Sequence, residues 1–210
     1  MNINITYAVT VCNEFVEIQR LMSFLLLHKR QQDNIVVLYD EANGDPEVEE
    51  FLRTHSLNGE FAWHKAKFQN HFADWKNRLS SLCNGDYIFQ IDADEVPHEK
   101  LIEVLPDILE ANGGNVDVIR VPRVNTVEGL TESHIAKWGW NVDSEKRINW
   151  PDYQWRIWKN IPSIKWINKV HEQLSGFNSY SHFPDAVEMS LYHPKTIERQ
   201  ERQNNYYETL

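Results

Sequence analysis

The chain has 210 residues, a formal net charge of −10, 41% hydrophobic residues and 25% charged residues. This length suffices for one domain with a sizeable core, and the composition is ordinary for a globular protein. The acidic balance argues against a nucleic-acid partner, which would need a basic surface, and an anionic ligand would need a local cation such as a metal ion.

Strand-like and helix-like segments alternate along the first 121 residues. Apolar β-rich runs predict strands, and apolar residues three or four apart predict helices. The expected order is a strand over 3–11, a helix over 13–30, a strand over 34–39, a helix over 47–55, a strand over 61–64, a helix over 72–82, a strand over 87–91, a helix from 97 to about 110, and a strand over 116–121. This alternation predicts an α/β fold whose central, mostly parallel sheet is flanked by helices.

The second half of the chain has weaker periodicity. Residues 122–162 are rich in Trp, Asn and charges, 164–170 predict a strand, and 194–210 predict a polar terminal helix. Trp138 and Trp140 would either stack on a sugar or pack within a loop. Because no repeat or linker separates the halves, we expect a single domain over 1–210.

Cysteine usage and hydropathy bear on the compartment. Cys12 and Cys83 form no CxxC or zinc set, which predicts free thiols in a reducing compartment. The N-terminus lacks the pattern of a signal peptide, and the apolar stretch over 21–27 is too short to span a bilayer. We therefore expect a soluble, cytoplasmic protein without a membrane span.

Two carboxylates follow the apolar strand over 87–91, in the sequence Asp92-Ala93-Asp94. Residues two apart on an extended strand point to the same side, and ligands bind beyond the carboxyl ends of such strands. Clustered oxygens suit Mg²⁺ or Mn²⁺, which commonly bridge to substrate phosphates. The alternative is that these acids cap the following helix.

Other residues are candidates for holding a nucleotide. Asp40 ends the second strand, where an acid often contacts a nucleoside, although it also suits the turn before Asn43-Gly44. The first strand is followed by Asn13 and Glu14 without a glycine-rich phosphate loop. Phosphates would therefore be met by a metal together with Lys76 or Arg78.

Three histidines and one further acid complete the candidates. A lone histidine is more often structural, yet His171 with Asp94 would suit Mn²⁺, with His193 as the second choice and His182 on the surface. Asp152 lies among aromatic residues, where desolvation would raise its pKa and make it a better general base. Its alternatives are a helix cap or an ion pair with Arg156.

In their order along 3–195, these elements resemble the nucleotide-sugar glycosyltransferases of family 2, which have the GT-A fold. The motifs that carry the resemblance are Val11-Cys12-Asn13-Glu14, Tyr39-Asp40-Glu41-Ala42-Asn43-Gly44-Asp45, Phe72-Ala73-Asp74-Trp75-Lys76-Asn77, Ile91-Asp92-Ala93-Asp94-Glu95, Pro151-Asp152-Tyr153-Gln154-Trp155-Arg156-Ile157-Trp158 and Val170-His171-Glu172. One departure is Lys76, a point charge where the family often has the bidentate fork of Arg.

The resemblance implies a role for each matched residue. Residues 1–121 would form the nucleotide-binding half, 122–195 the half that holds the acceptor and the metal-binding histidine, and 196–210 a terminal helix. Val11, Asn13, Glu14, Asp40, Lys76, Asp92 and Ala93 would bind the donor, Asp94 and His171 would bind the metal, and Asp152 would be the catalytic base.

The implied reaction moves a sugar from a nucleotide-diphosphate donor, first of all a UDP-sugar, to a hydroxyl of a saccharide or glycoconjugate. Mn²⁺ or Mg²⁺ would be the cofactor. A nucleotidyltransferase and a non-catalytic sugar-binding relative are the alternatives. The first would usually need a basic glycine-rich loop after the first strand, which this chain lacks.

Overall fold

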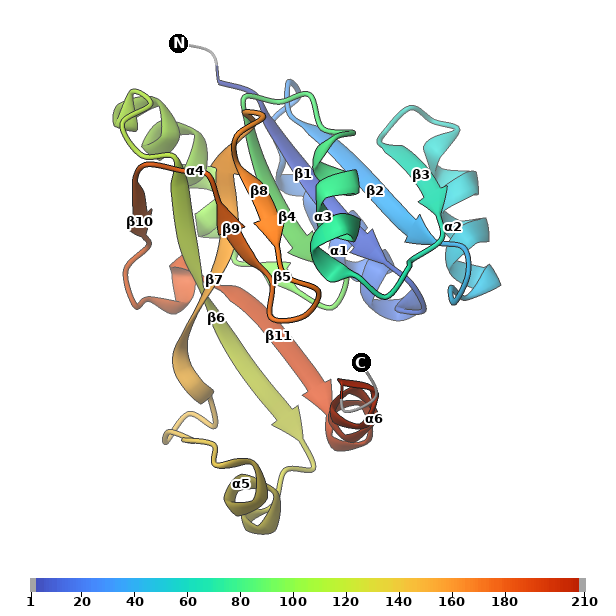
Figure 1. The fold of residues 1–210 in the computed structure, drawn as a ribbon, viewed down its shortest axis with the longest axis vertical. Helices are drawn as coiled ribbons and strands as arrows, with labels where there is room; N and C mark the ends of the chain where they lie inside the picture. The colour runs from blue at the N-terminus through green and yellow to red at the C-terminus, as the bar shows by residue number, and fades with distance from the viewer. Residues whose placement is uncertain (1–2, 208–210) are drawn as a thin grey trace.

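A mixed sheet forms the centre of the protein in the computed structural model, which describes residues 3–207 (Figure 1). The strand order is β3-β2-β1-β4-β7-β6-β11-β5, with β10 paired to β6, and β8 and β9 form a separate hairpin. The bounds are β1 Ile5–Val11, β2 Asn34–Asp40, β3 Ala62–Ala66, β4 Tyr87–Asp92, β5 Val96–Pro97, β6 Val118–Glu128, β7 Ile148–Lys159, β8 Lys165–Ile167, β9 Gln173–Ser175, β10 Tyr180–His182 and β11 Leu191–Thr196.

The direction of the strands confirms the mostly parallel sheet. Strands β3, β2, β1 and β4 run parallel, and β11 runs parallel to β6. Strand β7 is antiparallel to both β4 and β6, so it joins the two parallel parts. The carboxyl ends of β1, β2 and β4 therefore lie at one edge, which is where the sequence places its candidate acids.

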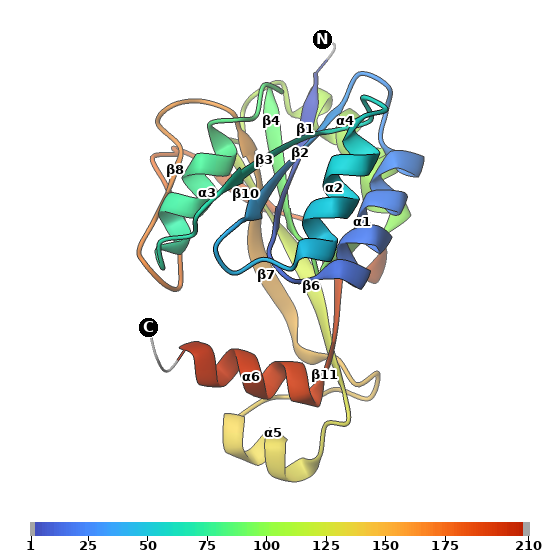
Figure 2. The ribbon, with the colours of Figure 1, turned by 90° about the vertical axis from the view of Figure 1, so that its right-hand side faces the viewer.

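Helices cover both faces of the sheet (Figure 2). Helices α1 (Phe15–His28), α2 (Pro46–Ser56) and α4 (Glu99–Asn112) pack on one face, and α3 (Phe72–Ser80) packs on the other with the β8–β9 hairpin. Alternation along β1 explains both layers, because Tyr7 and Val9 face the first cluster and Ala8 faces the second. The predicted helices and strands of the first half are all present, with most ends shifted by one to three residues, and the strand predicted to end at 121 continues to Glu128.

The structure departs from the prediction at Pro97 and in the region of weak periodicity. Pro97 lies in β5, and α4 begins at Glu99 behind His98, whose side chain accepts a hydrogen bond from the Lys100 amide. Residues 122–162 mostly form the long β6–β7 hairpin, with helix α5 (Glu132–Trp138) at its tip. The strand predicted over 164–170 is confined to Lys165–Ile167.

The final helix, α6 (Ile197–Tyr207), directly follows β11. Figure 2 shows that it lies between the lower end of the sheet and α5. Residues 208–210 of the predicted terminal helix are outside the described part of the chain. Within residues 3–207, no helix has the length and apolar character needed to cross a membrane.

Candidate active site

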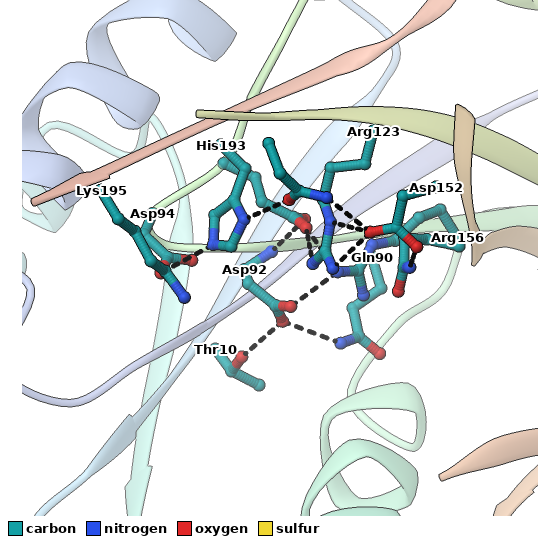
Figure 3. A network of polar contacts seen from close by, with 12 residues as sticks. Thr10, Gln90, Asp92, Asp94, Arg123, Asp152, Arg156, His193 and Lys195 are labelled. Atoms are coloured by element: carbon teal, nitrogen blue, oxygen red, sulfur yellow. Dashed lines mark hydrogen bonds and ion pairs between the residues drawn. The ribbon is translucent and has the colours of Figure 1, made fainter. Parts of the chain in front are cut away.

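Strand β4 delivers two carboxylates to the carboxyl edge of the sheet, but they face different partners. Asp92 is the last residue of β4, opposite Thr10 of β1. The Glu95 amide then donates to the Asp92 carbonyl at 2.9 Å, so the chain turns before Asp94 is reached. Asp92 consequently pairs with Arg156, and Asp94 pairs with His193 (Figure 3). The expectation that strand alternation points both carboxylates the same way is wrong, because the strand ends first.

A buried ion cluster holds Asp92 in place. The Arg156 guanidinium lies 2.7 Å from an Asp92 oxygen and 2.6 Å from a Glu95 oxygen. Glu95 is 0% exposed and Arg156 is 2% exposed, so the charges neutralise one another away from water. Burial alone would raise the pKa of Asp92, but the charges of Arg156 and Lys76 outweigh it and hold that pKa well below its usual range. Asp92 is therefore a fixed anion at neutral pH.

A second buried arginine links this cluster to β7. The Arg123 guanidinium lies 3.0 Å from Glu95 and 2.7 Å from Asp152. Asp152 also accepts hydrogen bonds from Asn125 at 2.8 Å and from Gln154 at 2.7 Å. The expected rise in the pKa of Asp152 is therefore wrong. Burial works to raise that pKa, but the charge of Arg123 and the hydrogen bonds from Asn125 and Gln154 lower it. The ion pair of Asp152 is with Arg123 rather than with Arg156.

Hydrogen bonding fixes the tautomer of His193. An ionised Asp152 only accepts, so the Asn125 atom beside it is the amide nitrogen. The Asn125 oxygen then faces His193 Nδ1 at 2.8 Å, which must carry the proton. Burial lowers the pKa of His193, which favours the neutral ring. The unprotonated Nε2 consequently points at Asp94 Oδ2, 3.2 Å away.

This arrangement fits a divalent cation. A neutral histidine Nε2 and a carboxylate oxygen are both electron-pair donors, so they favour a cation between them. Adjacent ligands of an octahedral ion at about 2.1 Å are roughly 3 Å apart, close to the 3.2 Å observed. A hydrogen bond that orients the other ring nitrogen is also typical of metal-binding histidines. Within residues 3–207 no group of three or more His, Cys, Asp or Glu side chains is placed to hold a metal, so other ligands would be water or substrate oxygens.

Two positively charged side chains also lie beside Asp94. Lys195 Nζ lies 3.7 Å and Arg199 Nη2 lies 3.4 Å from Asp94 Oδ2. Burial would raise the pKa of Asp94, but the charges of Lys195 and Arg199 help to hold it well below its usual range. Arg199 also contacts Glu14 at 3.4 Å and forms an ion pair with Glu17. The start of α6 is thereby bound to the carboxyl edge of β1 and β4.

The residues predicted to bind the donor lie around the same edge with differing exposure. Val11 and Ala93 are buried, and Asn13 is exposed. Glu14 accepts hydrogen bonds from the backbone amides of Cys12 and Asn13 at 2.8 and 3.1 Å. Their role in donor binding remains a prediction.

Asp40 is buried and organises its own loop. It accepts from the Ala42 and Phe68 amides at 2.9 and 3.0 Å and from the Asn43 side chain at 2.9 Å. These contacts match the turn-stabilising alternative for Asp40. They leave its contact with a nucleoside as a prediction.

Lys76 and His171 lie on the α3 side of the site. Lys76 forms an ion pair with Glu172 and lies over the Trp166 ring, while Arg78 is exposed. His171 precedes Glu172 in the β8–β9 turn and has a positive φ of 53°. Among residues 3–207, the polar side-chain contacts of Asp94 are with His193, Lys195 and Arg199. His193, the second choice from the sequence, is therefore the histidine beside Asp94, and metal binding by His171 remains a prediction.

Sequence reasoning missed most of the supporting charges. Glu95, Arg123, Asn125, Lys195 and Arg199 had no assigned role, although alternation gives a partial signal. Asp152 and Arg156 are four residues apart on β7, and His193 and Lys195 are two apart on β11, so each pair points to one side of its strand. Which sides meet depends on the pairing of β6, β7 and β11, which local periodicity does not reveal.

The sequence profile described as "Glycosyl transferase family 2" matches residues 6–178. The chain belongs to glycosyl transferase family 2. The mixed sheet, the helices on both faces and the carboxylates at the carboxyl edge agree with this assignment. A search of curated protein sequences finds no match.

Solved structures support the fold of this member of the family. TarS 1–349 of S. aureus matches with a TM-score of 0.57 and 11% identity, covering 92% of this chain and 60% of that one. TarS 1–349 in complex with UDP-GlcNAc matches with a TM-score of 0.58 and 12% identity, covering 93% of this chain and 59% of that one. This chain thus spans about three fifths of each TarS fragment. The similarity confirms the predicted GT-A fold.

Proposed function

We propose that this glycosyltransferase moves a sugar from a nucleotide-diphosphate donor, first of all a UDP-sugar, to a hydroxyl of a saccharide or glycoconjugate acceptor, with Mn²⁺ or Mg²⁺ bound at Asp94. The observation that carries the proposal is the Asp94–His193 pair at 3.2 Å, at the edge where β1 and β4 end. A carboxylate and a neutral imidazole suit Mn²⁺. The ion pair with Arg156 keeps the neighbouring Asp92 ionised.

Each proposed residue has a separate role in the transfer reaction. Breaking the bond between the anomeric carbon and the diphosphate passes through an oxocarbenium-like transition state, as in glycoside hydrolysis. When bound, a divalent ion supplies Lewis-acid stabilisation of the departing diphosphate. Asp94 holds it together with His193, or with His171 if the β8–β9 turn approaches, while Asp92 meets the ribose or the donor sugar.

Asp152 is the proposed acceptor-side base. Arg123 and Asn125 bind one of its oxygens, and the other accepts only from Gln154 among residues 3–207. A lone pair on that second oxygen is left to accept the proton of the incoming hydroxyl. The lowered pKa keeps Asp152 ionised but makes it a weak base, so its contribution should lie at the lower end of the range for general bases.

Mn²⁺ and UDP together are expected to stabilise the protein against heat. At ligand concentrations of about 100 times Kd, linkage gives about 2.7 kcal/mol, or roughly 5–10 °C in Tm for a domain of this size. The measurement is a thermal-shift panel of UDP, GDP, CDP, ADP and dTDP, each with Mn²⁺, Mg²⁺ or EDTA. Mn²⁺ alone and uridine alone are the controls. If no nucleoside diphosphate shifts Tm at saturation, the proposed function is wrong.

Asp152→Asn is expected to lower kcat about 100-fold with little change in donor binding. The amide keeps the shape and one acceptor oxygen but loses the charge that would attract the hydroxyl proton. Transfer rates and the donor Kd should be measured on the same preparation. Equal losses in kcat and in donor affinity would show that Asp152 instead positions Arg123 and Asn125.

A further inference from the structure

We propose that Lys195 and Arg199, where β11 passes into α6, bind the diphosphate of the donor and stabilise its negative charge as it leaves. This inference rests on the proposed function and adds two residues to it. The junction between β11 and α6 would then form the positively charged side of the donor site. It faces the carboxyl ends of β1 and β4.

Strand alternation places Lys195 at the site. Along β11, Leu191, His193 and Lys195 are buried and the residues between them are exposed, so His193 and Lys195 face the same side. Figure 3 shows Lys195 alongside His193, with both side chains directed at Asp94. The ammonium group of Lys195, which belongs to strand β11, therefore lies next to the Asp94–His193 pair.

Lys195 is unusually buried for a lysine at the end of a strand. Its side chain is only 5% exposed, and its ammonium group lies 3.7 Å from Asp94 and donates to Gln203. Lysine is rarely buried unless it is paired, and here the nearby carboxylate also pairs with Arg199. A buried ammonium that shares its counter-charge is suited to receive a second anion.

Arg199 adds a guanidinium from the first turn of α6. It is 23% exposed and reaches Asp94 and Glu14, each at 3.4 Å, and also Glu17. The 3.4 Å contacts are longer than the usual 2.7–2.9 Å of a charge-assisted hydrogen bond, so this fork is only loosely engaged by Asp94 and Glu14. Its planar donors match phosphate oxygens, whereas Lys195 offers a point charge.

Electrostatics favours a diphosphate over other ligands at this wall. A divalent cation at Asp94 would bind the carboxylate that now balances the charge of Lys195. At this short range the cation would also be repelled by the positive charges of Lys195 and Arg199. A diphosphate that arrives with the cation restores the balance, because its oxygens interact with the metal, the ammonium and the guanidinium together. Lys195 and Arg199 should therefore couple nucleotide binding to metal binding.

The test is to compare UDP and UMP binding, each with Mn²⁺, in Lys195→Met and Arg199→Gln by calorimetry. GDP and GMP replace them if the thermal-shift panel selects GDP. Each variant is expected to weaken diphosphate binding about 10- to 100-fold, the usual weight of a charged hydrogen bond, with a much smaller loss for the monophosphate. Mn²⁺ alone should bind as tightly as in the wild type, or more tightly, because a neighbouring positive charge has been removed.

Two controls separate charge from packing. Lys195→Arg keeps the charge and should retain most of the affinity, and Arg202→Gln removes an exposed charge from the same helix and should bind like the wild type. Unchanged diphosphate affinity in Lys195→Met and Arg199→Gln would overturn the inference alone, as would parallel losses for UDP, UMP and Mn²⁺. A wild-type protein that binds no nucleoside diphosphate would overturn the proposed function as well.

Discussion

Asp94→Ala is expected to lower kcat for sugar transfer about 1,000-fold, the effect of losing a key electrostatic group in an active site. The carboxylate is the proposed anchor of the metal, and without it the charge that develops on the leaving diphosphate has no Lewis acid beside it. The side chain is 15% exposed and lies outside both apolar clusters, but its loss leaves Lys195 without its carboxylate, so the variant should fold with reduced stability and is assayed well below its unfolding temperature. Transfer and donor hydrolysis with Mn²⁺ are the measurements.

Asp74→Ala is the matched control, because Asp74 lies on α3 with its side chain 77% exposed. It should keep wild-type activity. Circular dichroism should show the same helix content for both variants and the wild type. Metal-dependent hydrolysis by Asp94→Ala at the wild-type rate would remove Asp94 from the active site. A parallel pair, His193→Ala and His171→Ala, would identify the metal-binding histidine by which one weakens Mn²⁺ binding.

The sequence was most informative in the first half of the chain, where parallel strands alternate with helices. Strands β2, β3 and β4 each follow a predictable helix, and the four strands β1 to β4 pair in parallel, so periodicity was enough to place Asp40 and Asp92 at one edge. Asp94 was found for a related reason, since it follows a buried strand by two residues. The turn at Glu95 was not foreseen, and it is what gives the two acids separate partners.

The second half was less predictable because its structure depends on long-range pairing. Strands β6 and β7 meet with register shifts near Arg120 and between Arg123 and Asn125, and local sequence contains little information about such irregularities. Those shifts decide that Arg123 and Asn125 meet Asp152. The pKa of Asp152 was consequently expected to move in the wrong direction, because its aromatic sequence neighbours were visible and its cationic partner was not.

Arg156→Met is expected to lower the free energy of unfolding by about 3–5 kcal/mol, a large part of the total for an ordinary domain. The substitution keeps most of the side-chain volume but leaves Asp92 and Glu95 without the guanidinium that now lies 2.7 and 2.6 Å from them. Glu95 is 0% exposed, and within residues 3–207 its remaining ion pair is with Arg123. Urea unfolding at pH 7 gives the measurement.

Arg53→Met is the matched control, because its ion pair with Glu50 joins side chains that are 58% and 63% exposed. Its unfolding midpoint should barely move, since water solvates both charges once the pair is lost. Similar losses for the two arginines would contradict the view that burial makes the Arg156 cluster important.

The free energy of unfolding that Arg156→Met loses should also depend on pH, in a direction that can be predicted. In the wild type the pKa of Asp92 is depressed, so its contribution to stability is present at neutral pH and is lost as the pH falls through that low value. In the variant the largest charge that opposes burial is gone and only Lys76 and Arg123 still lower the pKa of Asp92, so that pKa rises and acid reduces the penalty by protonating the carboxylate. The stability difference between wild type and variant should therefore shrink between pH 7 and pH 4. A difference that stays constant over this range would show that lost packing, rather than uncompensated charge, destabilises the variant.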